Sequence, residues 1–393
     1  MNDVVIGISV LPLGWNGDLK KGMPSLYFGV KGLTDRVKEY HYVTIGMKNQ
    51  PKHEIIESIH IHRYTVNFKP SNRKVLYTFT MILYWLIIVI KSHNIASKIA
   101  KKSRPNIIIA HTYYAAIPTY LLSKKYKTPS VFREYGTMQL YNLVNKGFIG
   151  KLRRFYEVLA YKLNFNLFIL TDDGSKTDCA ARKLGVSKEK IVFLRNGYFE
   201  TKDVRPIDSL RDKFVLTTAS RLTKYKNVDK ILIAFANSVA RKDAILIIIG
   251  EGELKNDLVK LSDKLGINDS ILFTGAITRE KVLEYFMSSE IVLSMGSINP
   301  LLESMTCGKA VITLNLGDTN KIVSNKVNGL LLEENNIVLI TNAINLLYEN
   351  DILRKETGLN AKKFIENNYD TWEHRIQKEV NEIMKLIEKR NKL

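Results

Sequence analysis

Short runs of β-branched and other apolar residues alternate with helix-length segments from one end of the chain to the other. Strands are expected at residues 4–10, 42–45, 107–111, 130–133, 167–170 and 191–194, and again at 214–219, 245–249, 271–274, 291–294 and 310–314. Near-continuous apolar strands between helices predict parallel sheets covered on both faces. Because 393 residues exceed one ordinary core, we predict an α/β protein with two doubly wound, Rossmann-like domains.

The segment 198–213 is polar and charged and contains Pro206, so it is the expected linker between a domain at 1–200 and a domain at 201–370. The final residues, 371–393, carry apolar side chains at helical spacing among basic ones. They predict an amphipathic helix that packs back onto the body through Ile376, Val380, Ile383 and Ile387.

The formal net charge of +20 requires an anionic partner or surface. Basic residues cluster in the first half, at Lys98, Lys101, Lys102 and Arg104, at Lys124, Lys125 and Lys127, and at Lys151, Arg153 and Arg154. The sequence has no helix-turn-helix, zinc-finger or RNP-like pattern, so we expect no nucleic-acid partner. An anionic membrane surface fits these clusters better because they flank apolar runs.

Two features of the chain concern its compartment. Cys179 and Cys307 stand alone and far apart, which argues against a disulfide framework and for a reducing, cytoplasmic environment. The first residues have no basic segment and no cleavage-site pattern, so they predict a strand rather than a signal peptide.

The longest apolar run, 75–90, is bracketed by Lys74 and Lys91. Its 16 residues fall short of the roughly 20 that span a bilayer. The run is apolar on all sides, which indicates a helix that is buried or dips into a membrane interface. A true membrane span is the alternative.

Two basic residues, Arg221 and Lys226, follow the predicted strand 214–219, at the end where ligands of open α/β sheets bind. The planar fork of an arginine and the point charge of a lysine together suit a diphosphate. A solvated basic loop is the alternative. The next strand ends in Gly250 and Gly252, which could let backbone approach a ligand, although the third glycine of a dinucleotide fingerprint is missing.

Glu303 lies among leucines and a methionine at the start of a short apolar helix. An isolated ionised carboxylate is costly in such surroundings unless it is paired or hydrogen-bonded. A helix N-terminus also offers free N–H groups and the positive end of its dipole, so this position suits a polar ligand. A capping glutamate in the first helical turn is the alternative.

Four blocks of the second half carry a family resemblance: Arg221 with Lys226, Gly250 with Gly252, Phe273 with Gly275, and Leu301 to Ile312. In this order and spacing they closely resemble the donor-binding half of glycosyltransferase family 4, the retaining GT-B glycosyl transferases group 1. Asn328-Gly329-Leu330 resembles a later motif of the family. The likeness extends over about 4–332 and is weaker in the first half.

The resemblance implies a GT-B fold, in which an acceptor-side domain (1–200) and a nucleotide-sugar donor-binding domain (201–370) face each other across a cleft. It implies transfer of a hexose-like sugar with retention of anomeric configuration, without a cofactor and without a metal, since no Asp-x-Asp pair occurs. Arg221 and Lys226 would hold the donor diphosphate and stabilise the leaving group, and Glu303 would bind the ribose hydroxyls. The further donor contacts that it implies are Gly22, Gly252, Ile277, Asn299, Leu301 and Leu302.

Two departures from the family pattern bear on activity. The acidic residue expected eight positions before Glu303 is Met295, and the histidine expected before Gly136 is Tyr135. His111, at another strand end, could serve a polar, catalytic role near the donor, and a structural histidine is the alternative. His60 and His62 share one face of a strand, and no metal site is expected there.

The leading hypothesis is therefore a transferase that lies peripherally on the cytoplasmic face of a membrane and adds a sugar to a glycan or lipid-linked acceptor. Synthesis of lipopolysaccharide or another cell-surface polysaccharide is the expected setting. A non-catalytic sugar-nucleotide-binding or assembly subunit with the same fold is the alternative, favoured by Met295 and Tyr135.

Overall fold

The structure is a computed structural model. It describes residues 3–11, 13, 24–46, 50–71, 73–136, 140–147, 151, 154–296 and 298–392. The chain divides into two compact units, which are described separately: unit 1 comprises Met1–Arg195 with Glu373–Leu393, and unit 2 comprises Asn196–Trp372. The linker expected at 198–213 thus lies inside unit 2, and the final helix belongs to unit 1.

Unit 1 is built on an eight-stranded sheet in the order β3-β4-β2-β1-β5-β6-β7-β8. All neighbouring strands run parallel except β3 and β4. The strands are β1 (Val4–Ser9), β2 (Glu39–Ile45), β3 (His53–Ile56), β4 (Ile59–Tyr64), β5 (Ile107–His111), β6 (Ser130–Glu134), β7 (Leu167–Asp172) and β8 (Ile191–Arg195).

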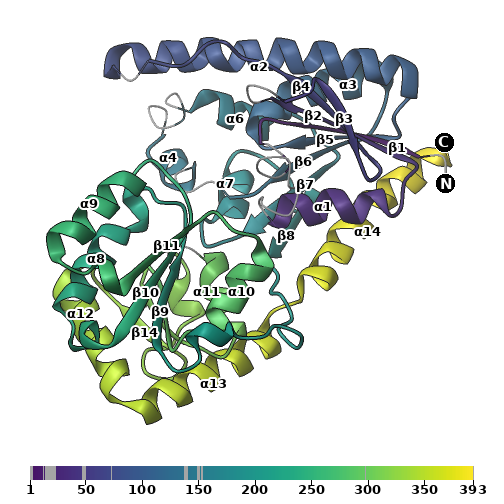
Figure 1. Ribbon diagram of the computed structural model, residues 1–393. Coiled ribbons are helices and arrows are strands. Elements are labelled where there is room, and N and C mark those ends of the chain that lie inside the picture. Colours follow the sequence, from purple (N-terminus) through teal and green to yellow (C-terminus); the bar gives the residue numbers. More distant parts are fainter. Residues whose placement is uncertain are drawn as a thin grey trace. The chain divides into compact units, whose positions relative to one another are not determined.

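Helices cover this sheet (Figure 1). They are α1 (Pro24–Thr34), α2 (Lys74–Ser103), α3 (Ala116–Tyr126), α4 (Leu140–Asn145), α6 (Phe155–Lys162), α7 (Thr177–Lys183) and α14 (Trp372–Asn391), and a 3₁₀ turn, η1 (Tyr113–Ala115), precedes α3. The final helix, α14, packs on α1, where a Cβ on Gly32 would lie 2.6 Å from Ile376 Cγ2. The amphipathic segment therefore completes the core of unit 1.

Unit 2 is built on a six-stranded sheet in the order β11-β10-β9-β12-β13-β14, and every neighbouring pair is parallel. The strands are β9 (Phe214–Ala219), β10 (Ala244–Ile249), β11 (Ile271–Gly275), β12 (Ile291–Ser294), β13 (Ala310–Leu314) and β14 (Leu330–Leu332). The helices are α8 (Val228–Asn237), α9 (Lys255–Leu265), α10 (Arg279–Met287), α11 (Ile298–Thr306), α12 (Ile337–Glu349) and α13 (Asp351–Asn368).

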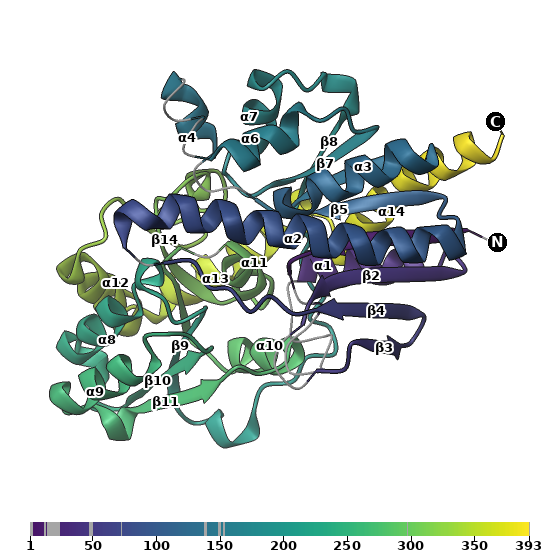
Figure 2. The same ribbon diagram turned by 90° about the horizontal axis from the view of Figure 1, so that it is seen from above.

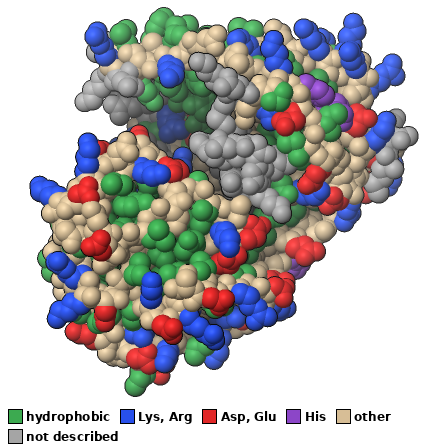
Figure 3. All heavy atoms as spheres, in the orientation of Figure 1, with side chains coloured by type: hydrophobic (Ala, Val, Ile, Leu, Met, Phe, Trp, Pro, Cys, Tyr) green, Lys and Arg blue, Asp and Glu red, His purple; other side chains and the backbone are tan. Residues whose placement is uncertain are grey.

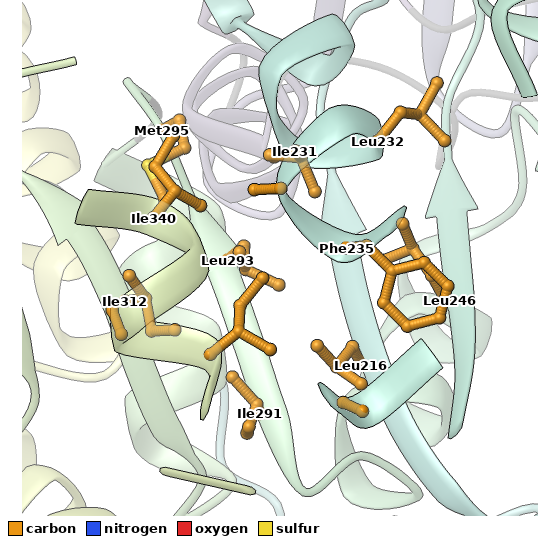
Figure 4. Close-up of a cluster of buried hydrophobic side chains, with 14 of the residues drawn as sticks. Leu216, Ile231, Leu232, Phe235, Leu246, Ile291, Leu293, Met295, Ile312 and Ile340 are labelled. Atoms are coloured by element: carbon orange, nitrogen blue, oxygen red, sulfur yellow. The ribbon is translucent and has the colours of Figure 1, made fainter. Parts of the chain in front are cut away.

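Side chains of the central strands and of α8 and α12 form the main core of unit 2 (Figure 4). Leu216, Leu246 and Leu293 from three strands meet Phe235 of α8 and Ile340 of α12, and all are buried. A β-strand buried on both faces needs apolar residues at successive positions, which is why these strands could be recognised in the sequence.

The predicted α/β class with two Rossmann-like halves is confirmed, and the strands predicted at 107–111, 214–219, 291–294 and 310–314 have the observed bounds. The antiparallel pair β3–β4 was not predicted as such. Its residues alternate between more and less buried positions, as an edge of the sheet allows, so it lacks the continuous apolar run.

Helix α2 is longer than the apolar run that predicted it, and it is not buried on all sides. Its inner face is buried at Trp85, Ile88 and Ala96, whereas Phe79 and Ile90 on its outer face are 61% and 58% exposed. In the described part of the chain, one helix, Leu76–Ser103, is long and apolar enough to cross a bilayer. Of its most apolar stretch, 28% is buried inside the protein.

Candidate functional site

The sheet of unit 2 changes direction of winding between β9 and β12. From β9 the chain adds β10 and then β11 on one side, and from β12 it adds β13 and then β14 on the other. Since these strands are parallel, the loops after β9 and β12 leave the sheet at the same edge. Such a switch point leaves a crevice where ligands of open α/β sheets bind.

Arg221 and Lys226 lie on the loop between β9 and α8. The Arg221 side chain donates to Tyr225 Oη at 2.7 Å, and Lys226 Nζ donates to the carbonyl oxygen of Gly296, after β12, at 2.5 Å. Among the described residues, neither cation has a carboxylate within 4.0 Å. Two positive charges thus stand at the switch point with neutral partners only.

The half-buried position of Lys226 affects its titration. Burial, reinforced by the nearby charge of Arg221, lowers the pKa of Lys226 to about 8. Two cations without carboxylate partners that lie close together each raise the free energy needed to keep the other charged. An anionic ligand would lower this free energy. The electrostatics therefore favour a phosphate group over the solvated-loop alternative.

The glycine pair after β10 serves the same loop. A Cβ on Gly250, whose φ is +135°, would lie 1.9 Å from the carbonyl oxygen of Ser220, and one on Gly252 would lie 2.4 Å from that of Leu222. The backbone amide of Leu222 donates to the carbonyl oxygen of Glu251 at 2.9 Å. These glycines permit a close approach to the Arg221 loop, and the approach of the same backbone to a ligand stays a prediction.

Glu303 is buried, with 2% of its surface exposed, and is the sixth residue of α11, so it does not cap the first turn. Its Oε2 accepts from the Arg279 guanidinium at 2.6 Å, and its Oε1 is buried without a partner in the described part of the chain. Burial raises the pKa of Glu303, and Arg279 only partly offsets this. A buried acceptor oxygen without a donor is a position that a ligand hydroxyl could fill.

The remaining donor-site candidates of unit 2 differ in what their side chains do. Leu301 and Leu302 are buried in a core cluster with Ile365 of α13, so only their backbone can meet a ligand. Asn299 Oδ1 accepts from the Asn196 amide at 2.8 Å. Ile277 is half-buried on the segment between β11 and α10. Gly22 lies outside the described residues.

Met295, which replaces the acidic residue expected before Glu303, does not face a polar site. It is 3% exposed and packs in the core beside Ile340 of α12 (Figure 4). This chain therefore offers no carboxylate at that position.

In unit 1, His111 ends β5 beside the corresponding switch point, between β1 and β5. Its Nε2 is 2.9 Å from Tyr40 Oη and its Nδ1 is 2.7 Å from Tyr135 Oη. Burial lowers the pKa of His111 to about 3; Arg133 adds to this effect and Glu379 opposes it. Both ring nitrogens are satisfied by tyrosines, which favours the structural interpretation of His111 over a catalytic one.

A buried ionic network lies next to this histidine. Arg133 Nε of β6 donates to Glu379 Oε1 of α14 at 2.9 Å, and Arg375 of α14 pairs with the other oxygen of Glu379. Burial alone would raise the pKa of Glu379, but the two guanidiniums outweigh it and hold the pKa below its ordinary value. The Arg133 guanidinium also lies over the Tyr135 ring, 4.2 Å from its centroid.

Two residues of interest were missed in the sequence. Arg279, the first residue of α10, pairs with Glu303 from 24 positions away, and no local spacing signals such a pair. Thr112, after β5, has φ +74° and ψ +164°, and its Oγ1 is buried without a described partner. A β-branched residue at positive φ is strained, and such strain gathers at functional sites. In the part of the chain that the structure describes, no three His, Cys, Asp or Glu side chains are placed to hold a metal.

Comparison with known proteins fits this geometry. Residues 200–364 match the sequence profile of the family described as glycosyl transferases group 1. Unit 2 is a glycosyl transferases group 1 domain. Arg221, Lys226, Gly252, Ile277, Asn299, Leu301, Leu302 and Glu303 all lie within it, whereas Gly22 and His111 do not.

Among curated relatives, an uncharacterized glycosyltransferase of Methanocaldococcus jannaschii is 31% identical over 250 residues, which is 61% of each chain. The match therefore spans about three-fifths of that relative's length. An N-acetylgalactosamine-N,N'-diacetylbacillosaminyl-diphospho-undecaprenol 4-alpha-N-acetylgalactosaminyltransferase of Campylobacter jejuni is 28% identical over 66% of this chain and 69% of its own.

Solved structures show the fold. Sucrose-phosphate synthase of Thermosynechococcus elongatus superposes with a TM-score of 0.74 at 16% identity, over 98% of this chain and 99% of the other. Anabaena HepE in complex with UDP and glucose superposes with a TM-score of 0.69 at 17% identity, over 98% and 100%. The fold of this protein is GT-B.

Proposed function

We propose that this protein transfers a sugar from a nucleotide-sugar donor to a glycan or lipid-linked acceptor, with retention of anomeric configuration. The observation that carries the proposal is the pair of cations, Arg221 and Lys226, without carboxylate partners among the described residues, at the switch point of a group 1 domain.

The pair suits the chemistry of a departing nucleoside diphosphate. As the bond between the anomeric carbon and the diphosphate breaks, negative charge grows on the leaving phosphate oxygen. Preorganised cations stabilise this charge in the transition state more strongly than they stabilise the bound donor. Removal of one charge-stabilising group typically lowers kcat by about 10²–10³-fold. Neither a metal ion nor a bound cofactor is needed for this step.

Glu303 would receive the ribose of the nucleotide. Its unpartnered Oε1 can accept from a hydroxyl, and Arg279 holds the other oxygen in place. The backbone amides in the first turn of α11 have no partners within the helix and can meet the phosphate or the sugar. The similar HepE was solved with UDP and glucose, so UDP-sugars are the first donors to test.

The acceptor is proposed to be membrane-held, and the protein to act peripherally on the cytoplasmic face of a membrane in cell-surface glycan synthesis. The similarity to an enzyme whose name specifies a diphospho-undecaprenol substrate supports a lipid-linked acceptor. The net charge of +20 supports an anionic membrane surface.

A panel of nucleotide sugars tests the proposal. A donor bound only by the folded protein raises the melting temperature, and an active enzyme also releases nucleoside diphosphate. We expect both effects for at least one donor, undiminished by a chelator, and NMR of the product should show the retained anomeric configuration. No melting shift with any donor would refute the proposal.

The alternative, a non-catalytic sugar-nucleotide-binding subunit, is favoured by the core position of Met295. It predicts a melting shift without release of nucleoside diphosphate or transfer, so the same panel separates the two functions.

A further inference from the structure

A segment without acidic residues runs from β4 through α2 and α3. No Asp or Glu lies between Glu57 and Glu134, whereas Lys and Arg recur throughout. Helix α2 is the longest element of this segment and lies along unit 1 beside α3 (Figure 2). A surface built from it attracts anions and has no carboxylates of its own to repel them.

The outer face of α2 has an apolar N-terminal half. Spacings of three and four residues place its large apolar side chains along one stripe of the helix. Each of these side chains exposes between about a third and three-fifths of its surface. They are Leu76, Phe79, Leu83, Leu86 and Ile90. Tyr77, 50% exposed, flanks the stripe. A contiguous apolar stripe on a surface helix indicates an interaction site.

The C-terminal half of the same face is basic. Lys98 and Lys101 continue the stripe, and Lys102 and Arg104 adjoin it, all exposed. Figure 3 shows this division along the edge over α2, with hydrophobic side chains gathered toward one end and Lys and Arg toward the other. The end of α3 adds Lys124, Lys125 and Lys127, since Tyr126 Oη donates to the Ser97 carbonyl oxygen at 3.2 Å and joins the two helices.

The inner face of α2 fixes the helix to unit 1. Trp85, Ile88, Ser92, Ala96 and Ala100 are all buried. The Lys91 ammonium donates to the carbonyl oxygen of Thr65 at 2.7 Å. A helix that crossed the bilayer would have to leave these contacts, so the geometry favours a helix that lies on a membrane rather than through it.

We propose that the outer face of α2 docks on a bilayer with anionic headgroups. The apolar half enters the boundary between headgroups and acyl chains, and the basic half, with the end of α3, binds lipid phosphates. The inference deepens the proposed function, because it names the surface that would bring the active site to a lipid-linked acceptor.

Charge and chemistry select this occupant over two others. A second copy of the chain would place one strongly basic surface against another, and the two would repel each other. A nucleic acid would bind the lysines through its phosphates but would leave the apolar stripe in water. A bilayer alone satisfies both halves of the face.

Co-sedimentation of the full chain with phosphatidylglycerol vesicles, and with phosphatidylcholine vesicles, tests the proposal. We expect at least tenfold tighter binding to phosphatidylglycerol, weakened when ionic strength rises from about 0.1 M to about 1 M and the Debye length falls from about 10 Å to about 3 Å. Equal binding to both lipids, or no binding, would overturn the proposal.

Two pairs of variants localise the docking face. Phe79→Glu with Leu83→Glu should reduce vesicle binding at least tenfold, whereas the matched pair Ile352→Glu with Leu359→Glu, on exposed positions of α13, should not. Lys98→Ser with Lys101→Ser and Lys102→Ser should remove most of the salt dependence, and the control Lys242→Ser with Lys260→Ser and Lys264→Ser should leave it. Equal losses in test and control would contradict the assignment to α2.

Donor-induced melting shifts, measured on every variant, keep the two proposals separate. A variant that keeps the shift is folded and has an intact donor site. Vesicle binding without any donor shift in the unaltered protein would leave the docking face standing and refute the proposed function. If light scattering instead shows a dimer that Phe79→Glu with Leu83→Glu dissolves, the face belongs to a second copy and the lipid proposal is wrong.

Discussion

Each unit has a mainly parallel sheet with one switch point, and the polar side chains at the two switch points are paired differently. In unit 1, His111 ends β5 with both ring nitrogens bonded to tyrosines, and Arg133 beside it is neutralised by Glu379. In unit 2, Arg221 and Lys226 meet only a hydroxyl and a carbonyl oxygen among the described residues.

The difference separates structural from ligand-binding polarity. Arg133 and Arg375 share the carboxylate of Glu379 inside unit 1, and a buried network of paired charges stabilises a core. Uncompensated cations and a buried carboxylate oxygen without a donor cost free energy until a ligand supplies the opposite partners. Location at a strand end alone does not distinguish the two cases.

The largest effect is expected in the buried network of Arg133, Glu379 and Arg375. Glu379→Ala removes the one carboxylate that pairs with both buried Arg133 and buried Arg375, and loss of one partner of a buried ion pair costs about 3–5 kcal/mol. Urea unfolding measures this loss. The control Glu382→Ala, on the same helix, breaks an exposed pair with Lys385 and should cost no more than about 1 kcal/mol. Similar losses for both would show that the network is not structural.

Arg221→Ala should act on catalysis and leave stability alone. Its side chain is exposed, so unfolding should change little, but transfer should slow by about 2.7–4 kcal/mol of activation free energy, as for other lost charge-stabilising donors. The neighbouring exposed lysine provides the control, since Lys224→Ala alters charge in the same loop. Equal loss of activity in both variants would show that Arg221 has no specific role, and the contrast between the two switch points would fail.

Gly250→Ala should displace the loop that carries Arg221. The added Cβ would meet the Ser220 carbonyl oxygen at 1.9 Å, and alanine at a φ of +135° adds about 1–3 kcal/mol of backbone strain. We expect a lower melting temperature and a reduced donor-induced shift. Gly266→Ala is the matched control, because its φ is +64° and nothing lies within 4 Å of the added atom. It should lower the melting temperature without changing the donor shift.

The smallest effect is a pH dependence of donor binding. The pKa of Lys226 is about 8, so as pH rises through this value the lysine loses its proton and the diphosphate loses one cation. Donor affinity of the free protein should therefore fall above pH 8, by at most about tenfold per pH unit. Lys226→Arg, whose side chain stays charged, should abolish the inflection in titration calorimetry. An inflection that survives in Lys226→Arg would assign it to another group.

Much of the fold and part of the site could be predicted. Apolar strands such as β9 and β13 were recognised because burial on both faces demands continuous apolar runs. The edge pair β3–β4 was not, since half-buried strands mix polar and apolar residues. Arg221, Lys226 and Glu303 were singled out as candidates from block order and spacing, but the Arg279 partner of Glu303 was not, and the contact of Gly250 and Gly252 with the Arg221 loop was not foreseen.

The sequence alone determined the alternation of strands and helices, and with it two mainly parallel sheets whose strand ends carry polar residues. Tertiary structure decided which of those polar residues are already paired: Arg133 meets a carboxylate 246 positions away, whereas Arg221 finds no carboxylate among the described residues. It also turned one face of an apolar helix inward and left the other in water. Periodicity and propensity act over a few residues, but pairing and exposure depend on sheet order and packing between distant segments.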